Sequence, residues 1–116
     1  GPGIGRVIQP DVPRTPRIVS PEQSDAIPVM RIPPDYPPSA IHRNIEGFVV
    51  VRLWIGTRGE VTRTEVAQAY PRGVFERAAL AAVRRWKYRP AESDGQPVGR
   101  GPLEVLLDFK LDDAQR

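Results

Sequence analysis

The 116-residue chain contains no cysteine and one histidine, and it has no apolar run near the roughly 18 residues that a membrane-spanning helix needs. The absence of cysteine excludes disulfides, a thiolate nucleophile and cysteine-ligated zinc. With His42 alone, a histidine-rich metal site and a histidine-based catalytic centre are not expected either, and we predict no cofactor and no enzymatic activity. These absences leave one small domain at most.

Proline is abundant but unevenly distributed. Of 14 prolines, 10 fall between Pro2 and Pro38, and only 4 fall in the 78 residues from Ser39 onward. Such spacing removes backbone donors and favours polyproline II. We therefore predict a Pro-rich arm over residues 1–34, either a semi-rigid linker or a disordered tail, and a folded domain over residues 35–116. Gly1-Pro2 is typical of a cleaved affinity tag, so we expect the native N-terminus and any anchor before it to be missing.

The charges follow the same division. Residues 1–38 are neutral overall, whereas residues 39–116 carry 13 basic and 10 acidic side chains, and the pI is near 9.8. A net charge of +3 is a weak field, so the surface is interpreted as an ordinary basic one rather than a nucleic-acid interface. The cationic cluster at residues 77–89 is expected to be a solvated helix face, with binding of anionic partners or lipid as the alternative.

Two strands are predicted at the start of the folded part. From Phe48 to Gly56 apolar residues alternate with period two, which is typical of a strand. Gly56 and Gly59 suit a tight turn, and a partner strand follows from about Glu60 to Ala69. Val61 and Val66 are an odd number of residues apart, so a bulge between them is needed to point both toward the core.

A helix and a third strand complete the pattern. Residues 74–87 repeat apolar side chains at helical spacing, with Trp86 on the core stripe, and residues 91–102 are expected to be a long connection. Leu103 to Leu111 alternates strictly. Together with a short helix at residues 39–44, this order predicts an α+β two-layer domain, with a small antiparallel sheet of about three strands and helices packed on one face.

Several residues in this order carry a family resemblance. They are Tyr36-Pro37 with Ala40, Glu46-Gly47, Gly59 with Val61, Phe75, Ala82, Trp86, Pro90, Gly95, Pro97-Val98 and the closing alternating strand. In this arrangement, from about Asp35 to Leu111, the chain resembles the C-terminal domain of TonB-family energy transducers. The Pro-rich segment fits as well, because in that family it joins an inner-membrane anchor to this periplasmic domain.

The resemblance implies a function. Such a domain binds the TonB box, a short N-terminal segment of outer-membrane transporters, and passes on energy from an inner-membrane proton-channel complex of the ExbB–ExbD type to drive nutrient uptake. Family members add the TonB box as a strand to the last strand of the sheet. The implied partner-binding residues are Asp35, Tyr36, Pro37, Leu103, Glu104, Val105, Leu106, Leu107, Asp108, Phe109, Lys110 and Leu111.

Two features depart from well-known members. Asp35 stands where glutamine is common, which favours a more basic flank on the bound segment. Phe48, Val50 and Trp54 stand on the outward face of the first predicted strand, where relatives tend to have polar residues. We expect something to cover this apolar face, most simply one of the apolar pieces of the arm, which are Val7-Ile8, Ile18-Val19 and Ile27 to Ile32. One of these pieces is also able to lie as an edge strand on a folded neighbour.

Two other functions stay open at this level. The first is a structural domain that dimerises through an exposed sheet edge. The second, weaker one is a basic nucleic-acid-binding module, for which Phe48, Arg52 and Trp54 give a faint pattern of aromatic and basic residues. Tyr36 is equally compatible with packing beneath the sheet edge and with contact to a partner.

Overall fold

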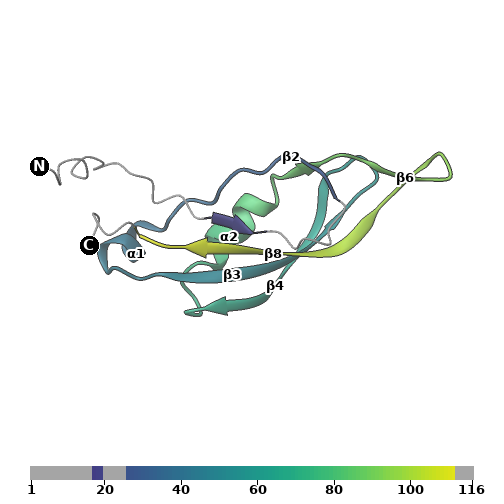
Figure 1. Ribbon diagram of the computed structural model, residues 1–116. Coiled ribbons are helices and arrows are strands. Elements are labelled where there is room, and N and C mark those ends of the chain that lie inside the picture. Colours follow the sequence, from purple (N-terminus) through teal and green to yellow (C-terminus); the bar gives the residue numbers. More distant parts are fainter. Residues whose placement is uncertain (1–16, 20–25, 112–116) are drawn as a thin grey trace, which may run out of the picture.

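The computed structural model describes residues 17–19 and 26–111. Its main sheet has four strands in the order β1-β8-β3-β4, and two pairs of short strands, β2-β5 and β6-β7, lie outside it (Figure 1). In chain order the elements are β1 (Arg17–Val19), β2 (Pro28–Met30), α1 (Pro38–His42), β3 (Gly47–Ile55), β4 (Val61–Tyr70), α2 (Glu76–Val83), β5 (Lys87–Tyr88), β6 (Ala91–Ser93), β7 (Gln96–Val98) and β8 (Arg100–Phe109).

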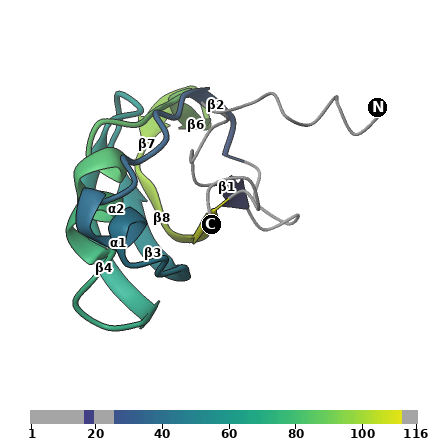
Figure 2. The same ribbon diagram turned by 90° about the vertical axis from the view of Figure 1, so that its left-hand side faces the viewer.

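The central strand β3 confirms the period-two pattern in the sequence. Val49, Val51, Leu53 and Ile55 are buried, and the residues between them are half-buried. β3 pairs antiparallel with β4 on one side and with β8 on the other. Both helices lie on the same face of this sheet, which gives the predicted two-layer α+β fold (Figure 2).

The core between the layers is built around aromatic side chains. Phe75 and Phe109 stack with ring centroids 4.3 Å apart, and both are fully buried. Trp86 is also fully buried and donates a hydrogen bond from Nε1 to the carbonyl oxygen of Ile32 at 2.8 Å. The prediction that Trp86 belongs to the core is confirmed.

Helix α2 is shorter than the predicted residues 74–87. It begins at Glu76 and ends at Val83, because the amides of Arg85 and Trp86 bond three residues back in a tightened last turn. Lys87 and Tyr88 then form β5, and the Tyr88 amide donates to the Gly59 carbonyl at 2.8 Å. Tertiary pairing therefore overrides the helical periodicity at this end.

The predicted irregularity in β4 is present. The register with β3 shifts between Trp54 and Ile55, where Ile55 pairs with Val61 but Trp54 pairs with Arg63. This bulge lies between Val61 and Val66 and sets both opposite core-facing residues of β3. Val61 packs against the core and is half-buried, but Val66 is 37% exposed, so the prediction that both valines face the core is confirmed for Val61 alone. A second shift occurs opposite Val50 and Val51.

Two pieces of the arm form short strands on the domain. β1 pairs antiparallel with β8, and β2 pairs antiparallel with β5. The sheet therefore has four strands in the described residues rather than the three expected. Of the two interpretations of Ile18-Val19 as a face cover or an edge strand, the structure supports the edge strand.

The connection predicted over residues 91–102 is more ordered than expected. β6 and β7 form an antiparallel hairpin, with Asp94 and Gly95 at positive φ in the turn. β8 already begins at Arg100, within the predicted connection. In Figure 1 this hairpin extends away from the helices. Across the described ranges, none of the helices has the length and apolarity to cross a membrane.

Candidate partner-binding edge

The last strand has the predicted alternation but different ends. β8 runs over Arg100–Phe109, so it begins three residues before the predicted Leu103 and ends two residues before Leu111. Pro102 lies within the strand, whereas the predicted connection ends at this residue. Four inward residues are buried, Leu103 is half-buried, and Glu104, Leu106, Asp108 and Lys110 alternate with them. The buried residues are Val105, Leu107, Phe109 and Leu111.

The C-terminal end of this strand is fixed by a carboxylate. The Leu111 amide donates to Glu46 Oε2 at 2.7 Å, and the Leu111 side chain is buried. Lys110 is exposed. Lys110 and Leu111 thus lie beyond the strand and are held against the start of β3.

The edge of β8 opposite β3 carries a strand from the arm. Arg17 pairs with Asp108, Ile18 with Leu107 and Val19 with Leu106. The Arg17 Nη2 atom lies 3.3 Å from Asp108 Oδ2. In the described residues, β1 pairs with positions 106–108 alone, and no strand pairs with Arg100–Val105 on this side.

Tyr36 joins the second predicted part of the site to the end of β8. Its ring makes edge contacts with Phe75 and Phe109 at centroid distances of 5.6 and 5.7 Å. Its hydroxyl donates to the Ile45 carbonyl at 2.6 Å, and the residue is 8% exposed. Of the two roles left open for Tyr36, the structure supports packing.

Asp35 and Pro37 flank Tyr36 on the surface. They line a groove of about 800 Å³ between the segment that precedes α1 and the exposed side of α2. The opposite wall includes Glu76, Arg77 and Arg85. The structure therefore brings Asp35–Pro37 close to the end of β8 through Tyr36, while Asp35 itself lies at a groove beside the helix.

Glu76 in this groove is held as a carboxylate. The Gly73 amide donates to both of its oxygens at 2.9 Å, at the start of α2. These bonds lower the pKa of Glu76, chiefly through the Gly73 amide, and burial opposes the shift only in part. The groove is thus lined by a carboxylate held by backbone bonds, by the exposed Arg77 and Arg85, and by apolar residues such as Ile32 and Val74.

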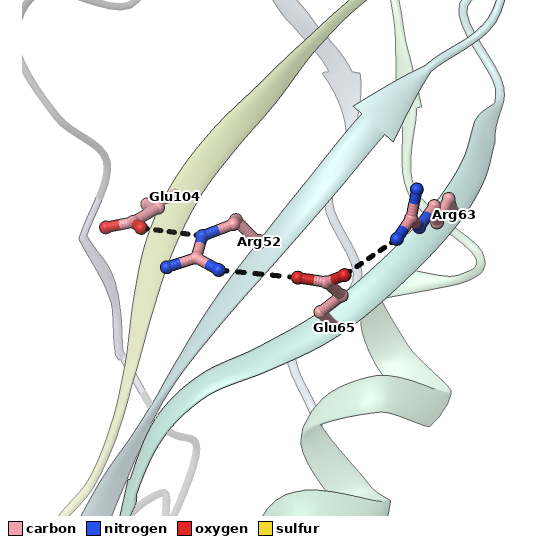
Figure 3. Close-up of polar contacts among 4 residues, drawn as sticks. All are labelled: Arg52, Arg63, Glu65 and Glu104. Carbon is pink, nitrogen blue, oxygen red and sulfur yellow. Dashed lines mark hydrogen bonds and ion pairs between the residues drawn. The ribbon is translucent and has the colours of Figure 1, made fainter.

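The outward face of the sheet carries a ladder of charges across three strands (Figure 3). Arg52 on β3 donates from Nε to Glu104 on β8 at 3.0 Å and from Nη1 to Glu65 on β4 at 3.3 Å. Arg63 donates to the same Glu65 at 2.8 Å. The hydrogen bond to Glu104 is the main cause of a raised pKa for Arg52. Glu104, a predicted site residue, is therefore already bonded within the sheet.

The apolar residues of this face are half-buried by neighbouring side chains. Phe48 stacks with Tyr70 at a centroid distance of 6.4 Å, and the Arg63 guanidinium lies 4.4 Å from the ring centroid of Trp54. In the described residues the arm does not lie across this face. The prediction that the arm covers Phe48, Val50 and Trp54 is wrong for Ile18-Val19, because β1 extends the sheet sideways instead. Ile27 to Ile32 contains β2, which pairs with β5 outside this sheet, and Val7-Ile8 lies outside the described residues.

Two charged residues that bond to β8, Arg17 and Arg52, are not among the predicted site residues. Arg17 gives only a weak signal, a cation beside a short β-branched pair between prolines. Arg52 gives a clearer one, because a single charge among outward apolar residues of a strand predicts carboxylates on the neighbouring strands.

The five basic residues predicted on the helix side are all exposed: Arg77, Arg84, Arg85, Lys87 and Arg89. Within the described ranges, no cluster of three or more potential metal ligands occurs.

Comparison with known proteins identifies the family. The model of the Gram-negative bacterial TonB protein C-terminal domain matches residues 32–111, which contain every element from α1 to β8. The chain belongs to the TonB family. It is 37% identical over 78 residues to Protein TonB of Escherichia coli K12, and 34% identical over 100 residues to that of Salmonella typhimurium. These alignments cover 67% and 86% of the chain, but only 30% and 35% of the relatives, so the chain spans about a third of their length.

Solved TonB structures share the fold. The solution structure of the Pseudomonas aeruginosa TonB C-terminal domain matches with a TM-score of 0.63 and 29% identity, over 84% of this chain and 97% of that one. The TonB2 protein of Vibrio anguillarum matches with a TM-score of 0.58 and 34% identity, over 80% of this chain and 88% of that one. The predicted TonB-like α+β fold is confirmed.

Proposed function

We propose that this chain is the periplasmic, partner-binding domain of a TonB-type energy transducer, and that it binds the N-terminal TonB box of an outer-membrane transporter as an added strand on β8. The observation that supports this proposal is the pairing of β1 with β8. An extended segment without a helix or core of its own already docks there by backbone pairing. This is the geometry of β-augmentation.

The other edge of the sheet is less suited to docking. β4 is the terminal strand on that side, but its register shifts twice and it carries Arg63 and Glu65. Bulges and charged side chains are the usual protection of an edge strand against pairing. The same features argue against the alternative of dimerisation through β4.

The strength of strand pairing fits a reversible interaction. Four to six ladder bonds at about 0.5 to 1.5 kcal/mol each give about 2 to 9 kcal/mol, whereas micromolar binding needs about 8 kcal/mol. Side-chain contacts are therefore required in addition. Asp108 at the edge and Asp35 at the groove supply anionic groups for a basic flank on the bound segment.

The wider role follows from the family. We propose that an anchor in the inner membrane and an ExbB–ExbD-type proton-channel complex act through the Pro-rich arm, and that the domain transmits their effect to transporters during nutrient uptake. No enzymatic step is proposed for this domain. Arg52 lies between two carboxylates and Arg63 lies over Trp54, which argues against the outward face as a nucleic-acid surface.

The test is a titration of the isotopically labelled chain with N-terminal peptides of transporters from the same genome. Amides of β8 and of Asp35–Pro37 are expected to shift most, and a scrambled peptide is expected to leave them unchanged. An Arg84→Glu variant serves as a control for simple charge attraction, because Arg84 is exposed directly after the end of α2. Shifts that concentrate on residues 77–89 instead refute docking at β8.

A further inference from the structure

We propose that β1 is an internal occupant of the partner-binding edge, so that a partner segment binds by displacing it. We also propose that the side chains of β1 define the chemistry that the edge accepts, namely a cation next to a β-branched aliphatic residue. The identity of the partner as a transporter segment rests on the function proposed above. The occupancy itself rests only on the pairing of β1 with β8.

The edge carries a recognition position for a cation. Asp108 points to the outward face, and its side chain is only 14% exposed, whereas the side chain of Arg17 is 75% exposed. The carboxylate is therefore fixed in the sheet, and the guanidinium approaches it from solvent at 3.3 Å. Any strand that replaces β1 meets this same fixed carboxylate, so a lysine or arginine at that position is favoured.

The next position accepts an aliphatic side chain. Ile18 pairs with the buried Leu107 and packs against the hydrophobic core, where it is half-buried. Val19 pairs with Leu106 on the outward face and is 48% exposed. The inward position therefore discriminates against polar residues, since burial of an unpaired polar group is unfavourable, whereas the outward position is permissive.

The contacts that hold β1 on β8 are few, so another strand is able to replace it. It has three residues, it is paired only through β8 in the described part of the chain, and its ion pair is open to solvent. Exposed ion pairs are screened and weak. Because β1 belongs to the same chain, it nevertheless competes at a high effective concentration and reduces the apparent affinity for any partner segment.

The experiment uses the full chain and a defined probe, a fluorescent peptide of residues 14–22 with the sequence RTPRIVSPE. Two variants weaken β1 by different means. Arg17→Glu places two negative charges against each other, and Ile18→Asp places a charge against the core. Both are expected to bind the probe at least about fivefold more tightly than the wild type, the lower end of typical coupling factors.

Matched controls make the same changes elsewhere. Arg84→Glu reverses an exposed charge directly after the end of α2, and Val29→Asp puts an acid on the exposed β2 strand of the same arm. Both are expected to bind the probe as the wild type does. An Asp108→Arg variant is expected to reverse the preference, binding a probe with glutamate at the Arg17 position more tightly than the original probe.

The outcomes separate this proposal from the proposed function. Equal affinity of the wild type and both β1 variants for the probe overturns the internal occupancy, and so does failure of either variant to bind it. If transporter peptides bind but ignore the β1 variants, the occupancy is also overturned while the proposed function stands. If the probe behaves as expected and no transporter peptide binds, the occupancy stands and the proposed function fails.

Discussion

Arg17 and Asp108 are 91 residues apart in the sequence and form an ion pair of 3.3 Å. This contact places a piece of the Pro-rich arm on the strand where TonB-family proteins are expected to take their partner. In the function proposed above, the arm is part of the binding site as well as a connection, because its strand β1 occupies the edge of β8.

The burial of Trp86 leads to a prediction on stability. Trp86→Ala removes a fully buried ring and its hydrogen bond to the Ile32 carbonyl. It should lower the free energy of unfolding by about 3 to 5 kcal/mol. Trp54→Ala is the matched control, because Trp54 is half-buried and its ring contacts the Arg63 guanidinium, and it should cost about 1 kcal/mol. Urea unfolding with equal midpoints for both variants contradicts this assignment of the core.

Alanine substitutions at Gly59 and Gly95 test the close approach of the backbone at Gly59 to that at Tyr88. Both have positive φ, 85° and 76°, but only at Gly59 does an added Cβ overlap another group, the Tyr88 carbonyl oxygen. Gly95→Ala should cost about 1 kcal/mol for the backbone conformation alone. Gly59→Ala should lower the free energy of unfolding by at least about 2 kcal/mol more than Gly95→Ala does, because the added Cβ also pushes Gly59 away from β5. Thermal unfolding that ranks the two variants equally refutes this close approach.

Glu76 predicts a pH dependence of stability. Its pKa is lowered in the folded state by the Gly73 amide. The stabilisation is therefore complete above the pKa of the unfolded chain, near 4.5, and is lost as the pH falls through the lower folded pKa. Glu76→Gln should cost about 0.5 kcal/mol at pH 7, a small value because the group is accessible to solvent. The difference from wild type should vanish at low pH, and a difference that persists at pH 2 excludes the carboxylate as its cause.

Much of the sheet could be predicted from the sequence because its long strands bury one face. The alternation in Phe48 to Ile55 and Leu103 to Phe109 reports that face directly, and the bulge in β4 followed from the spacing of Val61 and Val66. The resemblance to the TonB family implies the same two-layer α+β fold, and the solved TonB structures share it. Periodicity and resemblance together were enough for the fold.

The short strands could not be predicted in the same way. β1 and β2 have three residues each, too few for a period, and their partners lie far away in the sequence. The end of α2 also depends on a distant contact, between Tyr88 and Gly59. The β6–β7 hairpin is different. Asp94-Gly95 is a strong turn signal in the sequence, but the prediction of a long connection over residues 91–102 made no use of it.

Spin-label mapping distinguishes docking at β8 from docking at the helix. A transporter N-terminal peptide with a nitroxide at one end is added to the isotopically labelled full chain, and amide broadening is measured together with cross-strand contacts between Ile18 and Leu107. Docking at β8 predicts broadening along β8 and loss of the Ile18–Leu107 contacts as peptide is added. Broadening centred on Arg77–Arg85, with those contacts intact, would contradict it.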